Sequence, residues 1–135
     1  MPVKITTPHI LKLFALIFWY LSFVFLATIL TLQNHSSLFQ TTVRGGEYRW
    51  DFEAMFTAIY FVWGIYCWKA SKVPEKHILF IDFTIWANIL HAIVMTLVGA
   101  FRPGEFYHLL TDSLVIFIPA LVLLYTKSRL PKETL

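Results

Sequence analysis

The chain has 135 residues, of which 58% are hydrophobic and 14% are charged, and its formal net charge is +3. Soluble domains are about 45–50% apolar and about 25% charged. With a mean hydropathy of +0.66, this composition indicates a membrane protein and leaves no room for a large water-soluble domain. The basic residues form no stripe with exposed aromatic residues, which excludes nucleic acid as a partner. The single cysteine, Cys67, excludes an intrachain disulfide and a cysteine metal motif.

The first predicted spanning helix covers residues 9–32. Thr7 followed by Pro8 is typical of a helix N-cap and a first helical position. The apolar run that follows is longer than a signal-peptide core of about 7–15 residues, so we expect a retained helix. Its few polar residues do not share a face, and we therefore expect this helix to be structural and largely lipid-facing.

The second predicted span covers residues 52–70. Glu53, Tyr60 and Gly64 lie on one stripe of this helix, because residues three or four apart share a face. A glycine on such a stripe permits the close approach of another helix, so we expect the stripe to face protein. The short loop that follows contains Pro74 and predicts that the second and third helices are antiparallel neighbours.

The third predicted span, residues 77–100, carries polar side chains inside an apolar segment. Ionisable groups at the depth of a bilayer are costly, so they are candidates for function. Thr84, Asn88, His91 and Met95 fall within roughly 60° of one another around the helix axis. One stripe of this helix therefore needs partners from the other helices.

The distribution of basic residues predicts the orientation of the chain. Eight of them lie on the side of the N-terminal segment, the middle loop and the tail, counting Lys12 and Lys69 near the helix ends, and three lie in the two other loops. By the positive-inside rule, both termini are then cytoplasmic. Asp82 falls near the cytoplasmic end of the third span, where we expect it to reach the interface or to pair with Lys72 or Lys76.

The fourth predicted span covers residues 108–126. It follows Arg102-Pro103-Gly104, a sequence that ends the third helix and turns the chain. His108 and Asp112 are four residues apart, so they share a face in its first turns. Both are expected at the outer end of the bundle.

This topology brings acids and imidazoles from three spans to the outer end. Two histidines and two carboxylates suit zinc or a related divalent ion. The soft thioethers of Met55 and Met95 would shift the choice towards copper. The metal candidates are Glu53, His91, His108 and Asp112.

The same side chains suit other uses. A desolvated carboxylate and imidazole can be tuned for acid–base chemistry on a lipophilic substrate, with Glu53, His91 and Asp112 as catalytic candidates. Intramembrane acids and histidines also serve proton or ion passage. A simpler interpretation is that Asn88 and His91 only form hydrogen bonds between helices, while Glu53 and His108 lie at the membrane–water interface. The candidate ligand-binding residues are Glu53, Tyr60, Trp86, Asn88, His91, Met95, His108 and Asp112.

The segment from Glu53 to Asp112 carries a family resemblance. Its motifs are EAM at Glu53, Y-x-x-x-G at Tyr60 and Gly64, W-x-N-x-x-H-x-x-x-M from Trp86 to Met95, and H-L-x-x-D from His108 to Asp112. With these motifs the chain resembles a family of short bacterial four-helix membrane proteins of unknown function. The resemblance implies the four-helix fold and a bacterial inner membrane, and it implies no activity.

We therefore predict an all-α protein, a single domain over residues 1–135 that forms a four-transmembrane-helix bundle with both termini cytoplasmic. The predicted function is the binding of a divalent metal ion or a small lipophilic ligand in an outward-opening acid and histidine pocket. An accessory subunit of a larger membrane complex and a small membrane enzyme are the alternatives, so enzymatic activity stays open. An accessory subunit does not need Glu53, His91 and Asp112 to converge, whereas a site does. The expected partners are the bilayer of a bacterial cytoplasmic membrane and a lipophilic small molecule, with a homo-oligomer or a larger complex left open.

Overall fold

The computed structural model describes residues 5–31, 50–101, 106 and 113–130. Within these residues the chain is all-helical and contains no strand, which confirms the predicted fold class for this part. The first three predicted spans agree with the observed helices to within two residues at each end. The elements are α1 (Thr7–Thr31), α3 (Trp50–Ala70), the 3-10 helix η1 (Pro74–His77), α4 (Ile78–Phe101) and α5 (Leu114–Lys127).

The helix ends follow local sequence signals. The carbonyl oxygen of Thr6 accepts hydrogen bonds from the backbone nitrogens of His9 and Ile10, at 3.0 and 3.2 Å. Thr6 is therefore the N-cap of α1, one residue before the predicted cap, a difference that is common at helix ends. Helix α4 ends at Phe101, directly before the predicted stop at Arg102-Pro103-Gly104.

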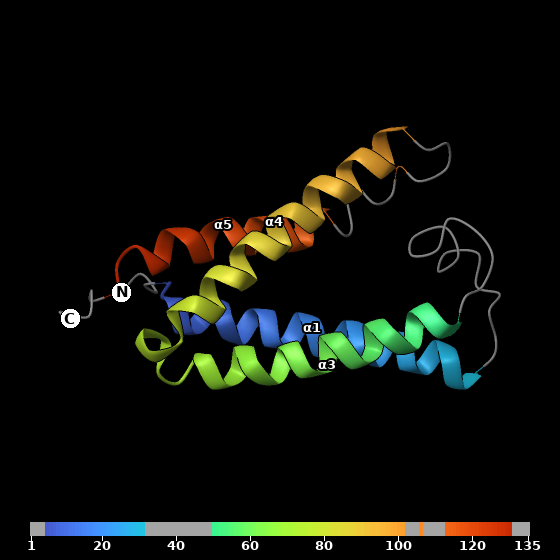
Figure 1. The fold of residues 1–135 in the computed structure, drawn as a ribbon, viewed down its shortest axis with the longest axis horizontal. Helices are drawn as coiled ribbons and strands as arrows, with labels where there is room; N and C mark the ends of the chain where they lie inside the picture. The colour runs from blue at the N-terminus through green and yellow to red at the C-terminus, as the bar shows by residue number, and fades with distance from the viewer. Residues whose placement is uncertain (1–4, 32–49, 102–105, 107–112, 131–135) are drawn as a thin grey trace.

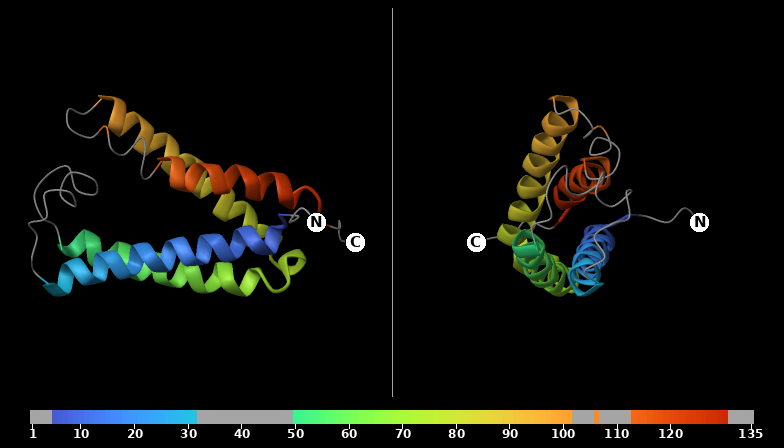
Figure 2. Two further views of the ribbon diagram at one scale, coloured as in Figure 1. Left: turned by 180° about the vertical axis from the view of Figure 1, so that it is seen from behind. Right: turned by 90° about the vertical axis from the view of Figure 1, so that its right-hand side faces the viewer.

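The four helices form two antiparallel pairs (Figure 1). Helix α1 packs most extensively against α3, and α4 packs most extensively against α5. The two pairs meet where α1 contacts α5 and where η1 joins α3 to α4. From there α4 runs away from α1 and α3, as both side views show (Figures 1 and 2). The predicted second and third helices are thus neighbours mainly near their connecting turn.

The core lies where the two pairs meet. Leu11, Phe14 and Phe18 of α1 are fully buried there, as are Ile81 and Ile85 of α4. Leu16 and Phe23 on other faces of α1 are exposed, so the expectation of a largely lipid-facing first helix stays a prediction. The buried face, however, supplies the largest buried side chains among the described residues. The sequence did not reveal this face, because a helix that is apolar all round has no polar side to contrast with it.

The interface between α1 and α3 is close because α3 presents a glycine to α1. A Cβ atom built on Gly64 would lie 2.5 Å from Nε1 of Trp19 and 3.2 Å from the carbonyl oxygen of Ala15. The hydroxyl of Ser22 also donates a hydrogen bond to the carbonyl oxygen of Thr57, at 2.9 Å. These contacts confirm that the Gly64 stripe of α3 faces protein.

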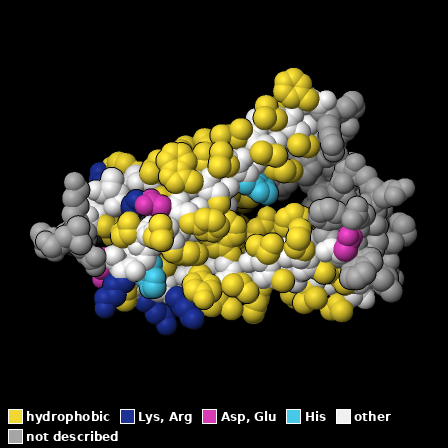
Figure 3. Space-filling view, viewed as in Figure 1, with side chains coloured by type: hydrophobic (Ala, Val, Ile, Leu, Met, Phe, Trp, Pro, Cys, Tyr) yellow, Lys and Arg dark blue, Asp and Glu magenta, His cyan; other side chains and the backbone are white. Residues whose placement is uncertain are grey.

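The outer surfaces of the helices are apolar, and the described Lys and Arg side chains gather at one end. Two helical segments are long and apolar enough to cross a membrane, Thr7–Ala27 and Pro74–Phe101, with hydropathies of 2.2 and 1.9. Helix α5 is apolar but shorter. Figure 3 shows hydrophobic side chains along the flanks and Lys and Arg side chains at the end where α1 begins and α5 finishes.

Candidate functional site

Half of the predicted polar stripe on α4 is buried in the protein. Thr84 is fully buried and Asn88 is 3% exposed. The hydroxyl of Thr84 accepts a hydrogen bond from Nε1 of Trp63 on α3, at 3.1 Å. The side-chain nitrogen of Asn88 donates to the carbonyl oxygen of Thr84 at 2.7 Å, so this bond lies within α4 and does not join two helices. Thr84 thus ties α4 to α3, and Asn88 supports the same turn.

The other half of the stripe, His91 and Met95, continues along α4 and is partly buried. These two residues lie in the part of α4 that diverges from α1 and α3. The stripe therefore runs from the packed core towards the part of α4 that lies away from α1 and α3.

Two further candidates from the sequence have different surroundings. Tyr60 is buried between α1 and α3, where its ring stacks on that of Phe18 with centroids 5.5 Å apart. Trp86 is 56% exposed on the surface of α4. Tyr60 therefore contributes to the packing of the first helix pair, while Trp86 points away from the core.

The predicted acid and histidine cluster cannot be assembled from the described side chains. His108, Asp112 and Arg102 lie outside the described residues, as does the side chain of Glu53. In the part of the chain that the structure describes, no group of three His, Cys, Asp or Glu side chains could hold a metal ion. The convergence of Glu53, His91 and Asp112 therefore stays a prediction.

The structure corrects the expected partner of Asp82. Its carboxylate forms an ion pair with Lys127 at the end of α5. Neither Lys72 nor Lys76 was the right choice, because Asp82 lies on the face of α4 that packs against α5. The expectation rested on closeness in sequence, whereas the antiparallel pairing of α4 and α5 brings the last turn of α5 beside Asp82.

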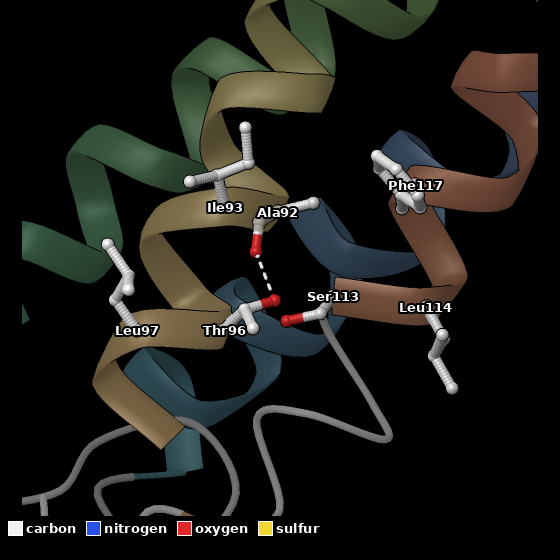
Figure 4. Close-up of a pocket in the computed structure, with 7 residues that line it drawn as sticks. All are labelled: Ala92, Ile93, Thr96, Leu97, Ser113, Leu114 and Phe117. Atoms are coloured by element: carbon white, nitrogen blue, oxygen red, sulfur yellow. Dashed lines mark hydrogen bonds between the residues drawn. The ribbon is translucent and has the colours of Figure 1, made fainter. Parts of the chain in front are cut away.

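A pocket of ≈ 380 Å³ lies between α4 and the first turns of α5. Its walls are mainly aliphatic and aromatic, with two hydroxyl-bearing side chains (Figure 4). This volume is in the range of about 300–1,000 Å³ that is typical of small-molecule sites. The lining residues are Ala92, Ile93, Thr96, Leu97, Ser113, Leu114 and Phe117.

The two hydroxyls of this pocket differ in their hydrogen bonding. Thr96 donates to the carbonyl oxygen of Ala92 at 2.7 Å, which leaves its oxygen able to accept. Ser113 is 5% exposed, and its hydroxyl has no hydrogen-bond partner among the described residues. Both hydroxyls turn toward the space between α4 and α5 (Figure 4). A buried hydroxyl without a partner is costly, so a ligand that accepts its hydrogen bond would be favoured.

This pocket was not among the sites predicted from the sequence. Its polar lining residues, Thr96 and Ser113, carry only hydroxyls, whereas the predicted sites were built around titratable side chains. The available signal was the pair of small polar residues facing each other across the third and fourth spans. Single threonines and serines are too common in apolar helices for that signal to stand out without the structure.

Among the comparisons with known proteins, only the one with protein-family models gives a match, which covers nearly the whole chain. No curated protein and no solved structure matches the chain. The predicted membership of an uncharacterised family is confirmed, whereas the bacterial origin and the membrane nature implied by the resemblance stay predictions. A family model described as a family of unknown function, DUF6632, matches residues 6–130, and the chain therefore belongs to this family.

Proposed function

We propose that this protein is a multi-pass membrane protein that binds a small lipophilic molecule between α4 and α5. Four spanning helices with cytoplasmic termini would place this pocket toward the outer side of a bacterial cytoplasmic membrane. Two helices of sufficient length and hydropathy support the membrane location, as do the large apolar side chains exposed on every helix. The basic end of the molecule supports the orientation.

The observation that carries the ligand is the buried hydroxyl of Ser113. It lines an otherwise largely apolar pocket and has no hydrogen-bond partner among the described residues. A ligand with an apolar body and one hydroxyl or carbonyl oxygen fits both properties, because its body would replace lipid contacts while its oxygen would pair with Ser113. An ionic ligand does not fit these walls, since a charge needs a partner when it leaves water.

The acid and histidine residues expected from the sequence adjoin this pocket along the chain. His91 precedes the lining residue Ala92, and Asp112 precedes Ser113. They are proposed to surround the polar end of the ligand. A metal ion held by Glu53, His91, His108 and Asp112 is the competing hypothesis, because these side chains, unlike the apolar walls of the pocket, could balance its charge.

The test is thermal stabilisation of the purified full chain in detergent by 1-decanol, with decane as the matched ligand that lacks a hydroxyl. We expect 1-decanol to raise the Tm more than decane does. In Ser113→Ala the affinity for 1-decanol should fall about threefold to tenfold, which corresponds to one lost neutral hydrogen bond. Thr96→Val, which keeps the shape of the side chain, tests the second hydroxyl in the same way.

Other outcomes would contradict this function. Equal stabilisation by decane and 1-decanol in all variants would show that the hydroxyl of Ser113 does not contribute to ligand binding. A metal ion bound to the purified protein and lost in His91→Gln and Asp112→Asn, measured by elemental analysis, would support the metal site instead. Loss of stability in these variants, with neither metal nor organic ligand bound, would favour the accessory-subunit alternative.

A further inference from the structure

A second concave surface lies between α3 and α4, separate from the pocket at Ser113. It is a groove of ≈ 500 Å³ lined only by apolar and aromatic side chains. Its walls include Trp63 and Tyr66 of α3 and Phe80 and Phe83 of α4. The rings of Trp63 and Phe83 face each other with centroids 5.2 Å apart, and those of Tyr66 and Phe80 lie 6.0 Å apart. Pairs of aromatic rings therefore join the two helices along the groove.

The end of this groove near η1 is basic. The ammonium group of Lys69 lies over the ring of Tyr66, 5.3 Å from its centroid, and so stands directly at the groove. Lys72 and Lys76 are exposed in the short connection between α3 and α4. Glu75 is the acidic residue of this connection. Asp82 does not offset these charges, because its carboxylate is paired with Lys127 on α5.

We infer that the groove between α3 and α4 holds an acyl chain of an anionic phospholipid whose phosphate contacts Lys69, Lys72 and Lys76. This inference rests on the membrane location in the proposed function, and it concerns a different site. The lysines lie at the end of the molecule that is proposed to be cytoplasmic, so the lipid belongs to the cytoplasmic leaflet. The aromatic walls contact the chain, and the lysines attract the headgroup by about 1 kcal/mol each.

The charges favour a lipid over a second copy of this chain. Two copies with the same orientation in a membrane are related by a two-fold axis along the membrane normal, so a symmetric contact through this groove would bring their basic connections close together. Like charges at that distance repel, whereas a phosphate neutralises them. A free phosphate ion would use the lysines but would leave the apolar groove without an occupant.

The test is native mass spectrometry of the full chain released from detergent with equal amounts of dioleoylphosphatidylglycerol and dioleoylphosphatidylcholine. The wild-type protein should retain phosphatidylglycerol at least about tenfold better. The double variant Lys69→Gln/Lys76→Gln should lose affinity for it by about fivefold for each lysine. Val62→Trp, which fills the groove without changing charge, should also lose the lipid.

Matched control variants distinguish lipid binding in this groove from nonspecific electrostatic attraction of an anionic lipid to the basic end of the protein. Lys12→Gln removes a positive charge at the same end, where Lys12 lies over Trp68 and not at the groove, and should retain the lipid. Leu16→Trp introduces the same side chain at a position of α1 that is 56% exposed, and this variant should also retain the lipid. Equal retention of both lipids, or equal losses in Lys12→Gln and the double variant, would overturn the inference.

Three further outcomes bear on the inference. A protein that is dimeric without added lipid and becomes monomeric in Val62→Trp would show that a second copy occupies the groove, which overturns the inference. Release of the protein from membranes by alkaline carbonate would overturn both the membrane location and the lipid site. Stable membrane integration without any preference for phosphatidylglycerol would overturn the lipid site alone.

Discussion

At the scale of single residues, the packing of α1 on α3 depends on the missing side chain at Gly64. The indole ring of Trp19 lies over this glycine, and its Nε1 donates a hydrogen bond to the carbonyl oxygen of Phe61 at 3.3 Å. The ring therefore both fills the space above Gly64 and attaches to the helix beside it. A side chain at position 64 would compete with the ring for this space.

We expect Gly64→Ala to lower the free energy of unfolding by roughly 1–3 kcal/mol, because overpacking forces neighbouring groups to move. The added Cβ would lie 2.5 Å from Nε1 of Trp19. The measurement is reversible unfolding in mixed detergent micelles. The same substitution in a Trp19→Phe background should cost less, since the smaller ring leaves room. An equal cost in both backgrounds would show that the indole is not the obstacle.

At the scale of secondary-structure elements, α4 is joined to its two neighbours by different interactions. The hydrogen bond from Trp63 to Thr84 joins it to α3, and the ion pair between Asp82 and Lys127 joins it to α5. The ion pair is partly accessible, with side-chain exposures of 35% for Asp82 and 25% for Lys127. Its contribution to stability is therefore modest, and it lies where the N-terminal part of α4 is beside the last turn of α5.

A double-mutant cycle tests this pairing. Asp82→Asn and Lys127→Gln should each destabilise the protein slightly, with a coupling free energy of about 0.2–1 kcal/mol. The cycle of Asp82→Asn with Lys76→Gln should show no coupling, because Lys76 is not the partner. Unfolding in detergent at low salt measures both cycles. Coupling to Lys76 and not to Lys127 would contradict the observed pairing of α4 and α5.

At the scale of the whole molecule, the two helix pairs lie close together at one end and diverge toward the other (Figure 1). The end where they lie close together contains η1, the first turn of α1 and the last turn of α5. The described lysines and arginines gather there, and the pocket at Ser113 lies in the other half of α4 and α5. An asymmetric molecule of this kind would present different chemistry to the two sides of a membrane.

Accessibility to an impermeant thiol reagent tests the proposed orientation. In a Cys67→Ala background, a cysteine at the exposed position Phe106 should react in intact cells, whereas one at Lys72 should react only after permeabilisation. The neighbouring Ser71 would be a poor labelling position on the same side, because its side chain is buried and only 4% exposed. The reverse labelling pattern would place the termini outside and would move the pocket at Ser113 to the cytoplasmic side.

Several features of the fold followed from the sequence. Apolar runs bounded by turn residues located the helices, because hydropathy and helix length depend on local composition. Gly64 predicted a close helix contact, since a missing side chain has the same consequence wherever the partner lies. The stripe from Thr84 to Asn88 predicted a buried face, because polar groups within an apolar helix need hydrogen bonds. The site was predicted less well: His91 remains a candidate, while Tyr60 belongs to the packing of α1 on α3.

The sequence by itself determined the helical class, the approximate limits of the first three helices and the residues that need partners. Only the tertiary structure decided which partners they have. Lys127 rather than Lys72 or Lys76 pairs with Asp82, and Ser113 meets α4 across a pocket, because both depend on how α4 and α5 pack. The sequence of an apolar helix contains little information about which helix it will pack against, since a side chain that packs well against protein also packs well against lipid. The fit between the helices in the folded protein therefore selects the partners.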